Sequence, residues 1–206
     1  PVKGTAAVMF GRDFGSASDA VTTIDHVTFT KVNADVQAEV AIGAVDTAQG
    51  SILVQNCTIK DYKYGMYFSG AKNLEVTGNA IDGTQYNGIM VENAVADYNV
   101  KITNNTLTNI SSANFSDPFY SSGISFGETV TNTTVTDNTV EMLNGKQDIY
   151  YQGTAVVDSQ EELTTALANS EIKNIIISGN ITLADNTFYN IDRKVSISGE
   201  TDASIT

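Results

Sequence analysis

The most regular feature of the chain is a short pattern of apolar and polar positions that recurs four times between residues 52 and 140. Each copy has apolar or Thr residues around one variable position, then a polar residue, a turn residue, Asn or Cys, a small residue and an apolar residue. The copies are 52–59 (ILVQNCTI), 74–81 (LEVTGNAI), 100–107 (VKITNNTL) and 133–140 (TTVTDNTV). Because side chains alternate along a strand, the pattern predicts a strand, a tight turn and a second short strand.

A further short strand is expected after each copy. Three of these strands open with Gly, at 65–68 (GMYF), 88–91 (GIMV) and 123–126 (GISF), and a fourth, 149–151 (IYY), has no Gly. Alternation predicts that one set of side chains faces a core: Met66, Phe68, Ile89, Val91, Ile124, Phe126, Ile149 and Tyr151. It predicts that the other set faces outward: Tyr67, Met90, Ser125 and Tyr150.

The spacing of the Asn/Cys column indicates a repeat architecture. Cys57, Asn79, Asn105 and Asn138 follow one another at steps of 22, 26 and 33 residues. The largest insertion, around 111–120, is expected to be a loop between two strands of one repeat. Periods of roughly 20–30 residues with short strands are typical of β-solenoids. Residues 4–10, 22–29 and 40–42 supply earlier strands, which gives about six coils.

From Thr22 to Tyr151 the chain resembles right-handed parallel β-helices of the pectate lyase-like superfamily. In that family an inward Asn at one turn stacks from coil to coil as an amide ladder. The resemblance therefore implies a structural ladder formed by Cys57, Asn79, Asn105 and Asn138, and continued by Asn180 further along the chain. A short amide suits this position because it satisfies backbone groups that a tight turn leaves pointing inward. The predicted fold is all-β, a right-handed parallel β-helix with one short amphipathic capping helix.

The sequence changes character after Tyr151. Residues 159–169 predict a helix, with Ser159 and Glu162 as a capping box and one apolar stripe. Residues 175–182 then repeat the strand and turn pattern around Asn180. We therefore divide the chain into a β-helix body, 1–154, and a cap-like segment, 155–206.

The cap-like segment lies at the opposite end of the sequence from its usual place. In β-helix proteins of this type such a helix and strand cap the N-terminal end of the stack. Three explanations remain open: a circular permutation, a piece cut from a tandem array, or head-to-tail docking onto another molecule. About five coils at ~4.8 Å must be crossed to fold back, whereas 152–157 span at most about 20 Å. We therefore predict a contact between residues 155–206 of one chain and 1–30 of another.

The charge of the chain limits its partners. With a formal net charge of −13 and only 11 Lys and Arg residues, nucleic acid and anionic membrane surfaces are unsuitable partners, and polyanionic sugars would be repelled unless a metal ion intervenes. Cys57 is the single cysteine, so no internal disulfide is possible. The sequence has no signal peptide and no apolar run near the length of a membrane span. It opens at Pro1 without Met, which we interpret as a mature or excised piece of a larger extracellular or cell-surface protein.

Aromatic side chains are the main binding candidates. Five tyrosines are predicted on one exposed face, where flat rings at coil spacing could stack on sugar rings: Tyr62, Tyr64, Tyr67, Tyr86 and Tyr150. The alternative is that outward tyrosines pair along the sheet and only stabilise it. Phe115, Phe119 and Tyr120 lie on the long insertion, which we expect to fold back over the sheet as a hydrophobic lid.

The sequence offers little catalytic machinery. Four carboxylates lie near the tyrosine face and could act as paired acids or hold Ca²⁺: Asp61, Asp82, Glu92 and Asp97. His26, the only histidine, sits at a turn beside Asp25 and is expected to face solvent. The resemblance implies an Arg or Lys base, but Arg12 and Arg193 both lie outside the repeats. The polygalacturonase signatures Asn-Thr-Asp, Asp-Asp, His-Gly and Arg-Ile-Lys are absent from the sequence.

Two hypotheses about function follow. The first is a non-catalytic module of a secreted or cell-surface protein, acting in structure or adhesion, that assembles head to tail and contacts glycans through its Tyr-rich face. The second is a carbohydrate-active enzyme, either a polysaccharide lyase or a glycoside hydrolase, or a fragment of one, which rests on fold analogy. The missing motifs favour the first. No cofactor is predicted, with Ca²⁺ as the alternative, and the expected partners are further copies of the chain and a polysaccharide.

Overall fold

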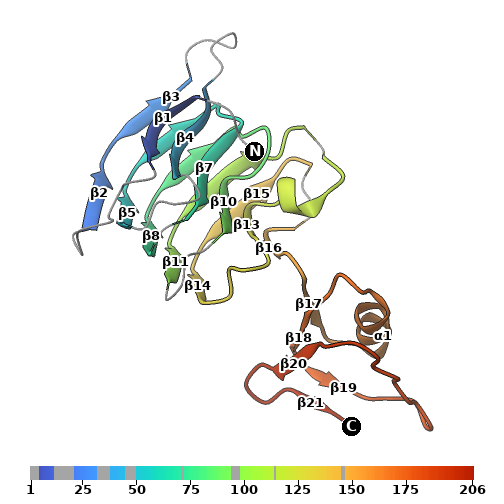
Figure 1. Ribbon diagram of the computed structural model, residues 1–206. Coiled ribbons are helices and arrows are strands. Elements are labelled where there is room, and N and C mark those ends of the chain that lie inside the picture. Colours follow the sequence, from blue (N-terminus) through green and yellow to red (C-terminus); the bar gives the residue numbers. More distant parts are fainter. Residues whose placement is uncertain are drawn as a thin grey trace. The chain divides into compact units, whose positions relative to one another are not determined.

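A computed structural model of residues 1–206 describes 5–11, 21–31, 38–44, 50–70, 72–93, 98–113, 115–144 and 147–206. The chain divides into two compact units, Pro1–Tyr150 and Tyr151–Thr206 (Figure 1). The sequence placed this boundary after residue 154. The two units are described separately below as unit 1 and unit 2.

Unit 1 is built from three parallel sheets, to which each turn of the chain contributes strands in a fixed order. Sheet A contains β1 (Thr5–Phe10), β4 (Ala38–Ala44), β7 (Tyr64–Ser69), β10 (Ile89–Asn93), β13 (Ile124–Phe126) and β16 (Ile149–Tyr151). Sheet B contains β2 (Val21–Asp25), β5 (Ser51–Gln55), β8 (Asn73–Thr77), β11 (Asn99–Thr103) and β14 (Thr133–Thr136). Sheet C contains β3 (Thr28–Thr30), β6 (Thr58–Lys60), β9 (Ala80–Asp82), β12 (Thr106–Ile110) and β15 (Thr139–Met142). The predicted parallel β-helix is confirmed, and each full coil has three strands.

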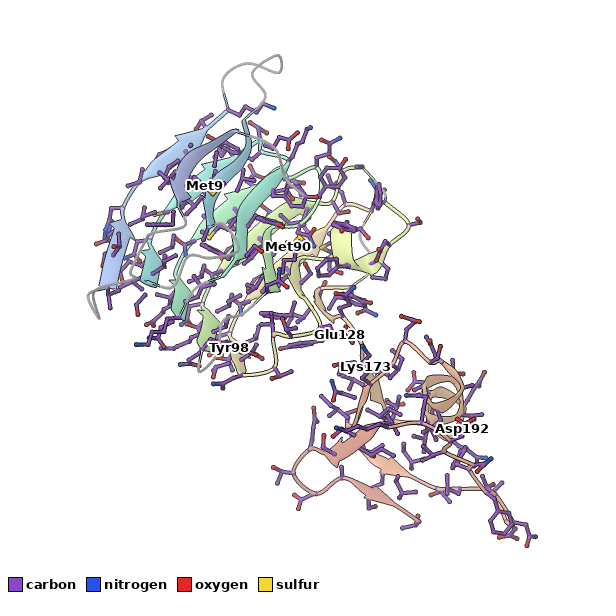
Figure 2. All side chains as sticks on the ribbon, in the orientation of Figure 1. Met9, Met90, Tyr98, Glu128, Lys173 and Asp192 are labelled. Atoms are coloured by element: carbon purple, nitrogen blue, oxygen red, sulfur yellow. The ribbon has the colours of Figure 1, made fainter. Side chains whose placement is uncertain are left out.

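The core of unit 1 consists of inward side chains stacked in register from coil to coil (Figure 2). In sheet B, for example, Ile52 pairs with Leu74, and Leu74 with Val100. The sheet A residues predicted to face the core are buried in β7, β10 and β13. The prediction is wrong for Ile149, which is 37% exposed, and Tyr151 is only half-buried. Both lie on β16, which has a neighbour on one side only.

An amide ladder runs through the turns between sheets B and C. The backbone N–H of Cys57 donates to Oδ1 of Asn79 at 2.9 Å, and that of Asn79 donates to Oδ1 of Asn105 at 3.0 Å. The backbone N–H of Asn105 donates in the same way to Oδ1 of Asn138 at 3.0 Å. The residue before each ladder position has a left-handed backbone, as Asn104 does with φ 57°. That conformation turns the next side chain inward, where its amide satisfies the backbone of two coils.

Unit 2 contains a helix and two small parallel sheets. Its elements are β17 (Thr154–Val157), α1 (Gln160–Ala168), β18 (Asn174–Ile177), β19 (Asn180–Ile181), β20 (Ser196–Gly199) and β21 (Ser204–Ile205). The sheets have the orders β17-β18-β20 and β19-β21. One core joins the helix to the strands through Val157, Leu163, Ala166, Ile175, Ile177 and Ile181.

Both ends of α1 are capped by side chains. The Glu162 backbone N–H donates to Oγ of Ser159 at 3.3 Å, and the Glu162 carboxylate accepts from the N–H of Asp158 at 3.0 Å. The predicted N-terminal cap is therefore present. At the other end Nη2 of Arg193 donates to the carbonyl oxygens of Ala166, Leu167 and Asn169 at 3.2, 3.2 and 2.9 Å. The positive charge at the helix C-terminus also interacts favourably with the helix dipole.

Asn180 does not belong to the amide ladder, contrary to the prediction from its sequence pattern. Its side chain is exposed, and its Oδ1 accepts a hydrogen bond from Ser204 at 2.8 Å. The turn before it contains no left-handed residue, and the buried Ile181 follows at once. Since strand side chains alternate, a buried Ile181 requires Asn180 to point outward.

Candidate functional site

The long insertion between β12 and β13 covers the outer face of sheet A. It carries a short 3₁₀ helix, Pro118–Tyr120, whose start is capped by the Asp117 carboxylate accepting from the N–H of Phe119 at 2.9 Å. Phe119 packs in a cluster with Tyr64, Tyr67 and Met90. The insertion thus forms the hydrophobic lid expected from its aromatic residues.

The lid changes the exposure of the sheet beneath it. The predicted outward direction of Tyr67, Met90 and Ser125 does not make them exposed, because Tyr67 is 8% exposed and the other two are fully buried. They do point away from the inner core, as alternation requires, but the insertion covers them. Asn87 holds the lid against the sheet. Its Nδ2 donates hydrogen bonds of 3.0–3.1 Å to the carbonyl oxygens of Phe119 and Ser122 and to the Ser125 hydroxyl.

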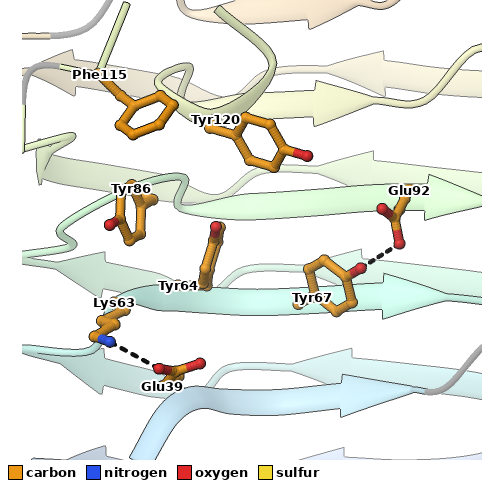
Figure 3. Close-up of a pocket in the computed structure, with 8 residues that line it drawn as sticks. All are labelled: Glu39, Lys63, Tyr64, Tyr67, Tyr86, Glu92, Phe115 and Tyr120. Carbon is orange, nitrogen blue, oxygen red and sulfur yellow. Dashed lines mark hydrogen bonds and ion pairs between the residues drawn. The ribbon is translucent and has the colours of Figure 1, made fainter. Parts of the chain in front are cut away.

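A pocket of about 320 Å³ opens beside the lid (Figure 3). Its lining comes from β4, β7, β10, the turns that precede β7 and β10, and the insertion. It consists of Glu39, Lys63, Tyr64, Tyr67, Tyr86, Glu92, Phe115 and Tyr120. Aromatic rings form a continuous chain along one side. Tyr64 stacks on Tyr86 with ring centroids 5.1 Å apart, Tyr86 meets the edge of Phe115 at 5.9 Å, and Phe115 meets Tyr120 at 6.0 Å.

Charged side chains occur in the pocket as bonded pairs. Nζ of Lys63 donates to Oε1 of Glu39 at 2.7 Å, and this bond raises the pKa of Lys63. The Tyr67 hydroxyl donates to the Glu92 carboxylate. The neighbouring phenols are partly shielded from water, and burial raises the pKa of Tyr64 and Tyr120 above that of a free phenol. The pocket therefore offers aromatic surface together with fixed hydrogen-bonding groups.

The predicted tyrosine face only partly coincides with this pocket. Tyr64, Tyr67 and Tyr86 line it, whereas Tyr62 and Tyr150 do not. The predicted exposure is wrong for Tyr62 and Tyr64, which are 6% and 9% exposed. Tyr150 is half-buried and packs against the edge of the aromatic cluster beneath the lid. Burial raises the pKa of Tyr62 and Tyr150 as well.

Sequence reasoning missed the ion pair at the pocket. Lys63 lies between two of the tyrosines, but Glu39 lies on the preceding coil and its relation to Lys63 depends on the strand register. Val40 pairs with Tyr64, which places Glu39 opposite Lys63. That register could have been inferred only by aligning the Gly-led strands of sheet A with β4, whose sequence AEVAIGA has no Gly at its start.

The predicted carboxylates do not form one site. Asp61 follows β6 and Asp82 is the last residue of β9 in the neighbouring coil, and the Asp61 N–H donates to the Asp82 carbonyl oxygen at 3.0 Å. The Asp82 carboxylate accepts from Asn109 at 2.7 Å, which lowers its pKa. Glu92 is in the pocket, and Asp97 lies outside the described residues.

His26 and the other side chains that could ligate a metal give no further site in the described part of the chain. His26 is exposed and its ring Nδ1 lies 2.6 Å from the Asp25 carboxylate. Among the described residues no three His, Cys, Asp or Glu side chains are grouped so as to hold a metal ion. In the same part of the chain, no helix has the length and apolar character needed to cross a membrane.

Three stacked parallel sheets connected coil by coil define a β-solenoid. Residues 14–166 match the family model described as "right handed beta helix region". The match covers most of the sequence, and the chain belongs to the right-handed β-helix family. Searches of curated proteins and of solved structures found no match.

Proposed function

We propose that this chain is a non-catalytic β-helix module of a secreted or cell-surface protein that acts in adhesion by binding neutral glycans in the sheet A pocket. The observation that carries the proposal is the pocket itself, in which aromatic rings lie beside bonded charged groups. Its volume of about 320 Å³ suits one or two sugar rings. The β-helix supplies a rigid surface for it.

Sugar rings match both parts of this lining. Their C–H faces pack on aromatic rings, and their hydroxyl groups exchange hydrogen bonds with carboxylate, ammonium and phenol groups. The ion pair Lys63–Glu39 and the bond between Tyr67 and Glu92 hold these groups in place before a ligand arrives. Such preorganisation lowers the entropic cost of binding.

The charge balance favours a neutral ligand. Two carboxylates and one ammonium group line the pocket, and the whole chain carries a net charge of −13. A polyanionic sugar would be repelled at long range and would meet Glu39 and Glu92 at short range. Neutral hexoses and their oligomers face no such penalty.

Calorimetric titration with a panel of neutral and uronic oligosaccharides tests the proposal. We expect neutral members to bind and Phe115→Ala, which removes an exposed wall of the pocket, to raise Kd at least about tenfold, or about 1.4 kcal/mol. Phe188→Ala is the matched control, because Phe188 is 89% exposed and belongs to unit 2. Absence of binding across the neutral panel, or equal affinity of the two variants, would refute the proposal.

The same titrations separate adhesion from catalysis. An enzyme would release shorter saccharides or unsaturated products during incubation, whereas an adhesive module returns its ligand intact. Glu92→Gln distinguishes the roles further: it retains hydrogen bonding to a sugar but removes the carboxylate that acid–base chemistry requires. Product release that disappears in Glu92→Gln would overturn the non-catalytic part of the proposal.

A further inference from the structure

The charges in the sheet A pocket do not cancel. The ammonium group of Lys63 lies 2.7 Å from the Glu39 carboxylate, so this pair carries no net charge. Glu92 has a different partner, because the group that donates to its carboxylate is the neutral hydroxyl of Tyr67. Among the described residues no Lys, Arg or His side chain forms an ion pair with Glu92. The pocket therefore has one uncompensated negative charge, which is located at Glu92.

The backbone of β10 fixes the position of this carboxylate. The residues on either side of Glu92 pair with Phe68 and Ser69, which are adjacent in β7, so Glu92 is an extra residue at a shift of register. Bulges of this kind redirect a side chain and are frequent beside functional sites. Gly127 in the next coil makes room for the bulge, because a Cβ atom there would lie 1.9 Å from the Glu92 carbonyl oxygen.

Phenol rings share the pocket with this carboxylate (Figure 3). Tyr67, which donates to Glu92, is 8% exposed. Burial raises the pKa of Tyr120, and the nearby negative charge of Glu92 raises it further. Burial likewise raises the pKa of Tyr64, with a smaller contribution from Glu92. A cation beside Glu92 would therefore meet aromatic rings as well as a carboxylate, and both stabilise positive charge.

We propose that the pocket takes an amino sugar, with its free ammonium group at Glu92, in preference to a neutral hexose of the same size. The inference rests on the proposed function, since it names the sugar unit that the same pocket prefers within an otherwise neutral glycan. A hexosamine has the same ring as a neutral hexose, so the aromatic lining contacts both in the same way. Its ammonium group adds the cation that Glu92 lacks.

The hydrogen bonds of both groups can be satisfied in this arrangement. The Tyr67 hydroxyl occupies one acceptor site of the Glu92 carboxylate, on Oε2, and an ionised carboxylate has further sites on both oxygens. An ammonium group only donates, and it can reach these sites and the phenol oxygens of the lining. Hydrogen bonds between ionised groups are stronger than those between neutral groups. The amino sugar therefore gains where a hydroxyl group at the same position would gain less.

The proposed preference requires a free amino group. Acetylation converts the ammonium into a neutral amide, which can make no ion pair with Glu92. The net charge of the whole chain, −13, also attracts a cationic sugar at long range, just as it repels a uronic one. We therefore expect discrimination between an amino sugar and its N-acetylated form.

The side chain of a peptide lysine also carries an ammonium group. Its flexible alkyl stem would cover little of the aromatic chain along the pocket, in which successive ring centroids lie 5.1–6.0 Å apart. A rigid sugar ring covers more of this surface and loses less conformational entropy on binding. The lining therefore favours a sugar over a lysine side chain, and the experiment below includes both.

Calorimetric titration of the full chain with matched ligands tests the inference. The ligands are cellobiose, the glucosamine disaccharide with the same linkage, its N-acetylated form, and lysine amide. A mildly acidic buffer keeps the amino groups charged while Glu side chains remain ionised. We expect the glucosamine disaccharide to bind about tenfold more tightly than each of the other ligands.

One variant locates the preference within the pocket. Glu92→Gln should reduce the ratio between the affinities for the glucosamine disaccharide and for cellobiose to about one, because the charge is lost. The ratio is the readout, since a change in the pocket that affects both sugars alike cancels. Glu141→Gln is the matched control: it removes the same charge from an exposed position of β15 in sheet C and should leave the ratio unchanged.

The outcomes separate this inference from the proposed function. Equal binding of the glucosamine disaccharide and cellobiose would overturn the inference and leave the proposed function standing. The inference alone also fails if Glu92→Gln retains the preference, if Glu141→Gln loses it, or if lysine amide binds as tightly as the glucosamine disaccharide. Binding of the glucosamine disaccharide without binding of cellobiose would support the inference and remove neutral glycans from the proposed function. Failure of every sugar to bind would overturn both.

Discussion

Asn79 and Asn105 are joined by two hydrogen bonds to one oxygen atom. The side-chain Nδ2 and the backbone N–H of Asn79 donate to Oδ1 of Asn105 at 2.9 and 3.0 Å. Both residues are almost fully buried. The two coils are therefore linked inside the core by polar groups that have no access to water, and an apolar replacement cannot fill this role.

Replacing Asn105 with Ala should lower the free energy of unfolding by about 3 kcal/mol or more. The change leaves the buried N–H of Asn79 without its partner and removes the hydrogen bonds that the Asn105 side chain donates to the carbonyl oxygens of Val76 and Thr103, although the Thr103 oxygen still accepts from the N–H of Gly78. Urea unfolding monitored by circular dichroism measures the loss. Asn99→Ala, at an exposed position of β11, serves as the control and should stay within about 0.5 kcal/mol of the wild-type value. Equal effects of the two substitutions would contradict the ladder.

Replacing Cys57 with Asn should stabilise the chain by about 1 kcal/mol. The Cys57 thiol lies 3.2 Å from the Gln55 carbonyl oxygen and 3.7 Å from that of Ile24. Nδ2 of Asn79 donates to the two corresponding carbonyl groups one coil later, at 3.0 and 3.1 Å. An amide at position 57 would therefore replace two weak thiol contacts with stronger hydrogen bonds. A lower urea midpoint in Cys57→Asn would show that the site cannot accept the larger side chain.

The ladder could be predicted from sequence because Asn, a residue that can satisfy the inward backbone groups of a turn, recurs at the spacing of one coil. A turn residue followed by Asn recurs at coil spacing, and buried turns require such an amide. The residues around Asn180 have the same sequence pattern, but their turn has no left-handed residue, so Asn180 does not point inward.

The burial of Tyr67 and Met90 could not be predicted from alternation. Alternation determines on which face of a sheet a side chain lies. Whether that face is buried depends here on the insertion between β12 and β13, which packs over it.

The lid should be destabilised by Asn87→Asp. The Asn87 amide group faces two carbonyl oxygens and the Ser125 hydroxyl, and it is fully buried. An ionised Asp can only accept hydrogen bonds and would repel the carbonyl groups, so we expect a loss of about 2 kcal/mol or more. Hydrogen exchange of the lid amides should accelerate. Ser116→Asp places the same charge at an exposed position of the insertion and should leave exchange nearly unchanged.

The buried tyrosines should make the chain sensitive to alkali. Burial raises the pKa of Tyr64 in the folded chain, whereas an unfolded Tyr titrates at about 10. Above that pH the unfolded state releases a phenol proton that the folded state keeps. The unfolded state then binds fewer protons, so stability must fall as pH rises. Below about pH 10 the contribution of Tyr64 is intact.

Urea unfolding at a series of pH values around and above 10 measures this slope, and phenolate absorbance follows ionisation in the same samples. Tyr64→Phe has no proton to release and should reduce the slope. The part of the phenolate absorbance that Tyr64 contributes should appear only with unfolding, because its ring is buried in the folded chain. A phenolate signal that titrates fully in the folded chain, or a slope unaffected by Tyr64→Phe, would show that the lid does not shield the pocket from solvent.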